Sequence, residues 1–286
     1  MRLTMYFSLV KGNISILASL SAVAGFILSA GESSLSPALP GVFLGTLLIA
    51  MGASALNQYQ ERDVDAKMER TRNRPIPSGE ISPGNALKVA LALSALGWLV
   101  LLYAGGPVAS GLGVFALLWY TLVYTNLKKV TAFAVIPGAI VGAIPPAIGW
   151  VSAGGMVTDP ELVILSFFFF IWQVPHFWLL TIRYGEDFKR AGLPAPSSRF
   201  SKKQLSRITF IWLMATAVTS LSLPLFNITG SPAIGILLTA GATLFILCSM
   251  FILKKDAKEV PVPALFRATN FFALLVILLI SIDGLI

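Results

Sequence analysis

Three oxygen-bearing side chains recur at helical spacing just after the second apolar run of the chain. Asn57, Glu61 and Asp65 are spaced i, i+4 and i+8, and on a helix this spacing stacks them along one face. Hard cations such as Mg²⁺ take oxygen ligands, typically one or two carboxylates together with the phosphates of a substrate. The stretch therefore predicts a metal site that faces a phosphorylated substrate.

Basic side chains follow these ligands at once. They are Arg62, Lys67, Arg70, Arg72 and Arg74. Guanidinium groups bind phosphate oxygens in bidentate fashion, and a lysine supplies a point charge. A diphosphate–Mg²⁺ site requires carboxylates that bind the metal beside cations that bind the anion, and this stretch offers both. Asp63 points away from the face that Glu61 and Asp65 share, so it serves either a second metal or an arginine.

A second polar stretch follows the sixth apolar run and offers the facing half of such a site. It contains Asp187, which we predict as a metal ligand, with Glu186 beside it and Arg183 one turn earlier. For Lys189, Arg190, Lys202, Lys203 and the basic segment 254–258, the favoured explanation is different. Juxtamembrane Lys and Arg commonly orient a chain and contact lipid headgroups.

The elements that position these residues are membrane-spanning helices by composition. Of 286 residues, 56% are apolar and 12% are charged, with a mean hydropathy of +0.81, whereas soluble domains carry about 25% charged residues. This composition excludes a disordered chain, a small soluble enzyme and an ordinary nucleic-acid-binding module. A single cysteine and a single histidine exclude a disulfide framework and a metal site built from several such residues.

We predict an all-α integral membrane protein with about nine transmembrane helices in one bundle and a single domain over residues 1–286. A helix that crosses the bilayer needs about 20 mostly apolar residues. The apolar runs are 12–30, 39–56, 84–104, 107–124, 132–151, 162–182, 208–227, 232–253 and 265–285. The third and fourth runs are separated by Gly105, Gly106 and Pro107, which predict a tight turn. Three prolines predict a kinked helix at 132–151.

The basic residues orient this bundle. All 21 Lys and Arg fall in the N-terminus and in segments 57–88, 125–131, 183–207 and 254–267, while the alternate connections hold only acidic charges. The positive-inside rule then places the N-terminus in the cytoplasm and the C-terminus outside. It also places both predicted active-site loops, near 57–83 and 183–205, on the cytoplasmic side.

The first apolar run has an alternative interpretation as a cleaved signal peptide. Basic residues precede it, and Ala22-Val23-Ala24 resembles a cleavage site. The run remains apolar as far as Ala30, however, which favours a retained helix.

The polar stretches resemble the first motif of the UbiA-type intramembrane prenyltransferases. That motif reads N-x-x-x-D-x-x-x-D followed by R-T-x-x-R-P. Its positions are matched here by Asn57, Asp65, Arg70, Thr71, Arg74 and Pro75, and Glu61 stands where the family usually has Asp. Within the superfamily the sequence is most similar to the haem O synthase (protohaem IX farnesyltransferase) branch. Five ordered blocks carry this similarity, at 62–75, 124–131, 142–150, 172–177 and 187–194.

The resemblance implies that farnesyl diphosphate is the prenyl donor, haem B the acceptor, haem O the product and Mg²⁺ the cofactor. It implies catalytic and metal-binding roles for Asn57, Glu61, Asp65 and Asp187, with Asp63 as a further possible ligand. The implied diphosphate-binding residues are Arg62, Lys67, Arg70, Arg74 and Lys128. It also implies a multi-pass protein of the plasma or inner membrane, with its active site on the cytoplasmic side, in contact with lipid and not with nucleic acid.

His176 lies inside the sixth apolar run, next to Pro175. An ionisable side chain inside a membrane span is a functional candidate by default, and histidine is a common ligand of haem iron. The Pro-His pair of the family adds to this, so we predict that His176 binds the acceptor. The alternative is a neutral imidazole that is hydrogen-bonded to a neighbouring helix.

Two other functions stay open at this point. One is a related membrane enzyme that prenylates a quinone precursor or another tetrapyrrole. The other is a non-enzymatic transporter with anion-binding loops. Transporters tend to place polar residues near the bilayer midplane on broken helices, whereas here they gather at one membrane face, which favours an enzyme.

Overall fold

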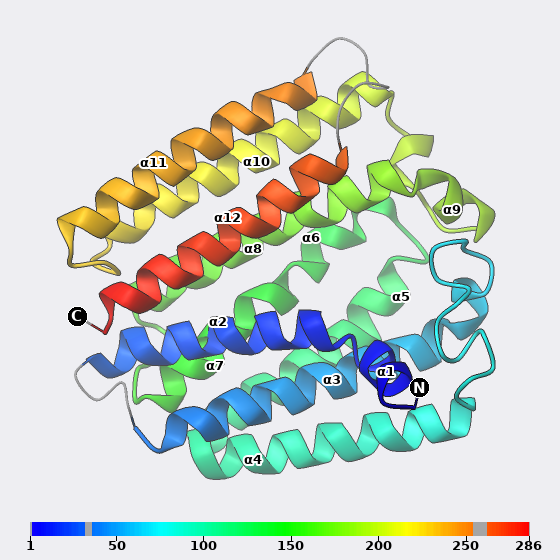
Figure 1. Cartoon of the computed structure of the whole chain (residues 1–286), viewed down its shortest axis with the longest axis horizontal. Helices are drawn as coiled ribbons and strands as arrows, with labels where there is room; N and C mark the ends of the chain where they lie inside the picture. Colours follow the sequence, from blue (N-terminus) through cyan, green and yellow to red (C-terminus); the bar gives the residue numbers. More distant parts are fainter. Residues whose placement is uncertain (1, 32–35, 254–261, 286) are drawn as a thin grey trace.

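The computed structural model of the chain describes residues 2–31, 36–253 and 262–285 as one bundle of long helices (Figure 1). The helices are α1 (Arg2–Leu9), α2 (Gly12–Ala30), α3 (Ala38–Asp65), α4 (Pro83–Leu118), α5 (Thr125–Leu127), α6 (Val135–Gly138), α7 (Ile140–Ser152), α8 (Pro160–Arg183), α9 (Gly185–Arg190), α10 (Lys202–Leu225), α11 (Pro232–Ser249) and α12 (Val262–Asp283). The basic segment 254–258 lies outside the described residues.

Eight helical segments of the described chain are long and apolar enough to cross a membrane. One of them, Pro83–Leu127, has 45 residues, about twice the 20 or so that one crossing needs. Gly106 interrupts it with a non-helical backbone (φ 81°, ψ −178°), a conformation that glycine adopts readily. A Cβ built on Gly113 would lie 2.9 Å from Leu101 Cδ1, so the chain doubles back at the predicted tight turn. The long segment thus corresponds to the third and fourth apolar runs.

The proline-rich run 132–151 is broken, as predicted. A 3-10 turn at Ala132–Ala134 and the short helix α6 precede α7. Close packing of α7 against α2 relies on small residues. A Cβ on Gly149 would lie 1.7 Å from the carbonyl oxygen of Ala22, and one on Gly25 would lie 2.1 Å from that of Pro146. Glycines let helix backbones approach closely in membranes, where dispersion contacts replace the hydrophobic effect between helices.

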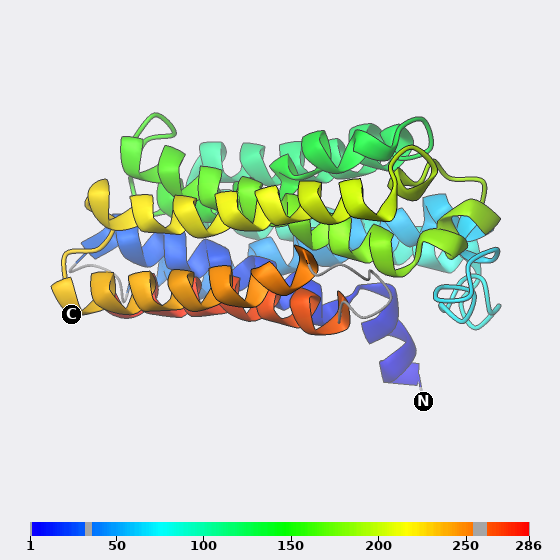
Figure 2. The same ribbon diagram turned by 90° about the horizontal axis from the view of Figure 1, so that it is seen from above.

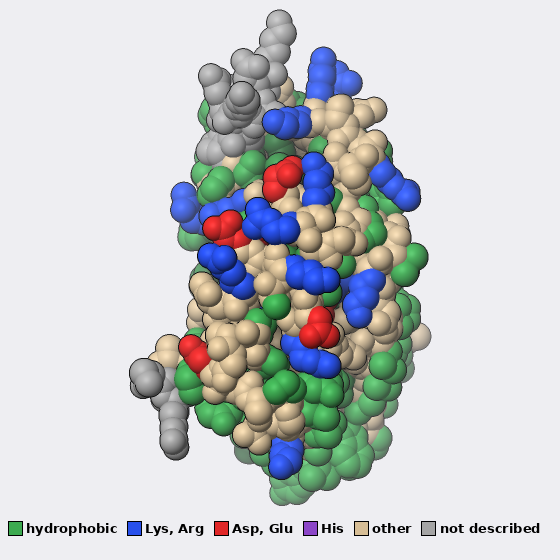
Figure 3. Space-filling view, turned by 90° about the vertical axis from the view of Figure 1, so that its right-hand side faces the viewer, with side chains coloured by type: hydrophobic (Ala, Val, Ile, Leu, Met, Phe, Trp, Pro, Cys, Tyr) green, Lys and Arg blue, Asp and Glu red, His purple; other side chains and the backbone are tan. Residues whose placement is uncertain are grey.

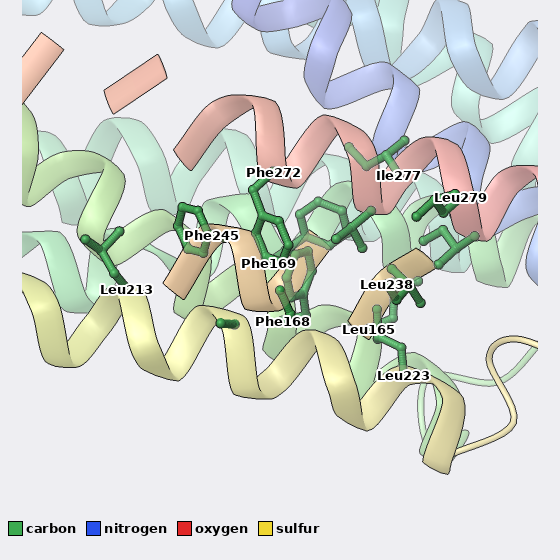
Figure 4. Close-up of a cluster of buried hydrophobic side chains, with 14 of the residues drawn as sticks. Leu165, Phe168, Phe169, Leu213, Leu223, Leu238, Phe245, Phe272, Ile277 and Leu279 are labelled. Carbon is green, nitrogen blue, oxygen red and sulfur yellow. The ribbon is translucent and has the colours of Figure 1, made fainter. Parts of the chain in front are cut away.

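Aromatic side chains pack the half of the bundle formed by α8, α10, α11 and α12 (Figure 4). The rings of Phe245 and Phe272 stack with their centroids 4.5 Å apart, and Phe168 meets Phe272 edge-on at 6.4 Å. Phe168 and Phe169 are buried in this cluster, whereas Phe167 is exposed on the outside of the bundle. These aromatics therefore hold helices together.

The polar connections gather at one end of the bundle, at the right of Figure 1, where the loop after α3 lies close to α9. Figure 3 views this end and shows Lys and Arg side chains spread over it with acidic side chains among them. The described chain starts near this end and finishes at the other. The short helix α1, which the apolar runs did not predict, projects away from the bundle here (Figure 2).

Candidate active site

The last two turns of α3 present three polar side chains to the interior of the bundle. Asn57, Glu61 and Asp65 are only 1%, 6% and 3% exposed. Asn57 Nδ2 donates to Glu61 Oε2 (2.8 Å) and lies 3.1 Å from Thr125 Oγ1. Buried carboxylates are costly unless paired, and the negative end of a helix dipole disfavours them further. These two carboxylates therefore require cationic partners.

Two cations from distant segments supply that pairing, and a third basic side chain, Lys11, joins the cluster through Asn57. Lys128 Nζ lies 2.5 Å from Glu61 Oε1, and Arg74 Nη1 lies 2.7 Å from Asp65 Oδ2. Lys11 Nζ donates to Asn57 Oδ1 at 3.1 Å. Burial lowers the pKa of Lys128, and the neighbouring Glu61 carboxylate opposes that shift. With three basic side chains around two carboxylates, the cluster suits an incoming anion, which would itself favour the protonated form of each base.

Lys11 is a site residue that the sequence did not reveal. Lys11 lies between α1 and α2 in a left-handed backbone conformation (φ 47°, ψ 52°). Its side chain reaches Asn57 and the Tyr120 hydroxyl. Burial, with added repulsion from Arg74 and Lys128, lowers the pKa of Lys11 to about 7. In the sequence it is a basic residue in front of an apolar run, the same pattern that orients a membrane helix.

The segment 66–82, which we name the arginine loop, is folded back onto the end of α3. Thr71 Oγ1 donates to the carbonyl oxygen of Asp65 at 2.9 Å, one of the carbonyls that a helix C-terminus leaves without a partner. Arg74 binds the side chain of the same Asp65, and Ile81 N donates to the carbonyl oxygen of Pro75 at 2.8 Å. The R-T-x-x-R-P motif thus closes the loop as well as supplying charge.

Asp187 joins the two predicted active-site segments. The chain leaves its helical path at Tyr184 (φ −115°, ψ 25°) before α9 begins. Asp187 Oδ1 accepts the backbone N–H of Glu69 (3.2 Å), and Oδ2 accepts that of Arg70 (3.1 Å). The Arg70 guanidinium lies over the Tyr184 ring, 4.7 Å from its centroid. The prediction that the two segments meet is confirmed, with Asp187 as a clamp on the backbone of the arginine loop.

The five predicted metal ligands are not all gathered at one point. Within residues 2–31, 36–253 and 262–285, no group of three or more His, Cys, Asp or Glu is placed to hold a metal ion. The Asp63 side chain is 85% exposed and lies 4.0 Å from Arg62, and Asp187 is engaged by the loop. Asn57, Glu61 and Asp65 form the oxygen-rich set that does come together, and metal ligation stays a prediction.

Two of the five predicted diphosphate-binding residues lie away from the carboxylates. Arg62 Nη1 donates to the carbonyl oxygen of Tyr59 (2.8 Å), and its guanidinium lies over the ring of the same residue. Lys67 is exposed. Arg74 and Lys128 contact the carboxylates directly, and Arg70 lies at the mouth of the site beside Tyr184.

His176 of α8 is bridged to α12. Its Nδ1 lies 2.7 Å from Asn270 Oδ1, and its ring packs against Phe266 and Trp172, with centroids 4.7 and 5.2 Å apart. The hydrogen bond to a neighbouring helix, which was the alternative for this residue, is therefore present. When Nδ1 carries the proton, Nε2 stays available as an acceptor or iron ligand, so the acceptor role stays a prediction.

The sequence profile of the UbiA prenyltransferase family matches residues 18–276. The chain belongs to this family. A protein of Geobacter sulfurreducens named protoheme IX farnesyltransferase is 44% identical over 222 residues, which cover 77% of this chain and 80% of that protein. A protein of the same name from Oleidesulfovibrio alaskensis is 36% identical over 280 residues, 98% of this chain and 96% of that one.

Solved structures support the fold of this UbiA prenyltransferase. A digeranylgeranylglyceryl phosphate synthase superposes with a TM-score of 0.76 at 20% identity, covering 100% of this chain and 99% of that one. A UbiA homolog from Archaeoglobus fulgidus, solved with GPP and Mg²⁺, gives a TM-score of 0.73 at 18% identity, with 98% and 99% covered. The UbiA prenyltransferase described here is thus a multi-pass membrane enzyme, which removes the transporter alternative.

Proposed function

We propose that this UbiA prenyltransferase transfers the farnesyl group of farnesyl diphosphate to a vinyl group of haem B and so forms haem O. The observation that carries the proposal is the cluster of three cations around the buried carboxylates of Glu61 and Asp65. It supplies what a prenyl diphosphate requires, and the relatives named protoheme IX farnesyltransferase support haem as the acceptor.

The donor diphosphate is proposed to bind Arg74, Lys128 and Lys11, with Arg70 at the entrance. Arg74 and Lys128 come from loops on opposite sides of the end of α3, so together they surround an anion that enters there. Fixed cations stabilise the negative charge that grows on a leaving diphosphate without reorganising during the reaction.

The residues present fit Mg²⁺ as the cofactor. Asn57, Glu61 and Asp65 offer the oxygen donors that a hard cation takes, and we propose Asp187 as a further ligand from the facing segment. Asp63 is left out because its side chain is exposed. When bound, Mg²⁺ acts as a Lewis acid toward the diphosphate.

The proposed reaction breaks the bond between farnesyl C1 and the diphosphate oxygen, and the bonding electrons leave with the diphosphate. The allylic cation is attacked by the haem vinyl group, which forms a carbon–carbon bond. Water then adds a hydroxyl to the resulting cation and releases a proton. Closely packed side chains such as Tyr124 and Trp178, 8% and 1% exposed, keep bulk water from quenching the first cation.

The test is a transfer assay with purified membranes, farnesyl diphosphate, Mg²⁺ and haem B, with the products read by mass. We expect haem that has gained one farnesyl group and one hydroxyl. Prenylation of a quinone precursor or another tetrapyrrole, with haem unchanged, would assign the enzyme to a different acceptor.

His176 is proposed to bind the haem acceptor. We expect His176→Ala to abolish haem binding, measured by the Soret absorption, while the affinity for farnesyl diphosphate persists. Asn270→Ala, which removes the partner of Nδ1, is expected to weaken haem binding without abolishing it. Loss of donor binding in His176→Ala would instead place this residue in the diphosphate pocket, and no effect on either would leave it a packing residue.

The active site is proposed to open to the cytoplasm. Accessibility tags in segments 57–80 and 183–205 are expected to report the cytoplasmic side of the plasma or inner membrane, and tags near Gly154 the other side. Because Asp187 binds the backbone of Glu69 and Arg70, tags that placed the two segments on different sides would contradict both the orientation and the shared site.

A further inference from the structure

A cavity of about 650 Å³ lies beside the diphosphate site at the same end of the bundle and shares Arg70 and Asp187 with it. It is bounded by the arginine loop, the junction of α8 and α9, the start of α10 and the start of α12. Its walls include Ile182, Arg183, Lys202, Leu205, Ile252 and Val262. Its volume is in the range of roughly 300–1,000 Å³ that ligand pockets occupy.

The acidic side chains of this cavity are already engaged. Asp187 accepts two backbone N–H groups and lies 3.5 Å from Arg190, which is also 3.7 Å from Glu69. Glu186 pairs with Lys189 at 2.9 Å. The anionic groups around the cavity are therefore balanced by neighbours within the protein.

Three basic side chains of the cavity have no ion pair among the described residues: Arg70, which lies at the mouth of the donor site, and Arg183 and Lys202. Arg183 stacks on the Tyr184 ring, 5.0 Å from its centroid, and neither it nor Lys202 has an ion pair with any residue that the structure describes. They come from α8 and α10 and face a space whose wall combines apolar side chains (Ile182, Leu205, Ile252 and Val262) with polar and charged ones. The cavity thus suits an amphipathic ligand that carries two carboxylates on an apolar body.

We infer that Arg183 and Lys202 bind the two propionate carboxylates of the haem acceptor, an inference that rests on the proposed function. The propionates occupy one edge of the porphyrin, and the vinyl groups occupy the opposite half. With the propionates at the rim, the vinyl groups point into the bundle. His176 lies six residues before Ile182 on α8, about 9 Å deeper at the rise of an α-helix.

The same orientation brings the acceptor toward the donor. Asn57 lies eight residues before the end of α3, about 12 Å below the mouth of the site. The Tyr124 ring meets the Phe177 ring, with centroids 5.6 Å apart. Phe177 in turn contacts His176. A haem held by its propionates at the rim therefore directs its vinyl edge to the depth at which the cation forms.

The experiment compares haem B with its dimethyl ester, in which both carboxylates are uncharged. Binding of each to the purified enzyme in detergent is titrated by the Soret absorption, without farnesyl diphosphate. We expect the ester to bind the wild type roughly 10-fold or more weakly than haem B, since each exposed ion pair is worth up to about fivefold. Arg183→Gln and Lys202→Gln are expected to weaken haem B about 3- to 5-fold each and to leave the ester unchanged.

Lys203→Gln is the matched control, because Lys203 is the exposed neighbour of Lys202 and does not line the cavity. It should bind both compounds as the wild type does. Equal affinity of the wild type for haem B and the ester would overturn the inference, as would an equal loss for both compounds in the variants. Failure of the proposed function is distinguishable, because it would appear as a wild type that forms no farnesylated haem.

Discussion

Lys11 gives the most discriminating test of the diphosphate site, because no sequence motif points to it. Its Nζ lies 3.1 Å from Asn57 Oδ1 and 3.4 Å from the Tyr120 hydroxyl. Lys11→Met keeps most of the buried stem and removes the charge. A unit charge about 5 Å from a phosphate oxygen contributes about 3 kcal/mol at an effective dielectric constant of about 20, and a charge-assisted hydrogen bond contributes about 1.5–3 kcal/mol net.

Both values predict a fall in kcat/KM for farnesyl diphosphate of roughly 10- to 150-fold. The assay is farnesyl transfer at saturating haem with the donor concentration varied. Lys129→Met is the control, because Lys129 is an exposed lysine at the same end of the bundle without an ion pair in the described chain. A Lys11→Met enzyme within about threefold of the control would refute the three-cation site, and recovery in Lys11→Arg would support it.

Three further predictions concern the clamp, the helix packing and the cofactor. Asp187→Asn leaves one side-chain oxygen for two backbone N–H groups, so turnover should fall about 10-fold or more and limited proteolysis should cut the arginine loop faster, whereas Glu186→Gln should behave as wild type. Gly149→Ala would place a Cβ 1.7 Å from the backbone carbonyl oxygen of Ala22, so turnover should fall, whereas Gly111→Ala, which meets nothing within 4 Å, should not. Chelation by EDTA should stop transfer and added Mg²⁺ should restore it; full activity in EDTA would contradict the proposed cofactor.

The apolar part of each helix could be predicted from the sequence, and so could the polar end of α3, but the polar start of α10 could not. The first run, 12–30, coincides with α2. The second run ends at residue 56, whereas α3 continues to Asp65, because its last turns are buried by charged partners and not by lipid. Helix α10 likewise starts at Lys202, six residues before its apolar run, behind a capping box formed by Ser201 and Gln204.

In the candidate site, too, some features could be predicted from the sequence and others could not. The spacing of Asn57, Glu61 and Asp65 is a local property of one helix, and the sequence therefore revealed it. The partners of these residues depend on contacts between segments far apart in the chain, such as Lys11 with Asn57, and a single sequence carries no record of them. Arg62 lies within the motif, directly after Glu61, and yet turns back to the carbonyl of Tyr59, since its direction is set by its position around α3.

Arg74 pairs with Asp65 and Lys128 pairs with Glu61, so these charges of the candidate site balance one another within the protein. The carboxylates of a buried site of this kind are neutralised within the protein and need no counterions from solution. On the proposed function, a diphosphate meets Arg74 and Lys128 side chains that are only 22% and 20% exposed, so it exchanges their partners and displaces little water from them. Because Arg74 belongs to the arginine loop, this exchange also breaks one of the contacts that hold the loop on α3. The hydrogen bonds of Thr71 and Asp187 keep the loop attached. On the proposed function, binding of the diphosphate therefore loosens the arginine loop.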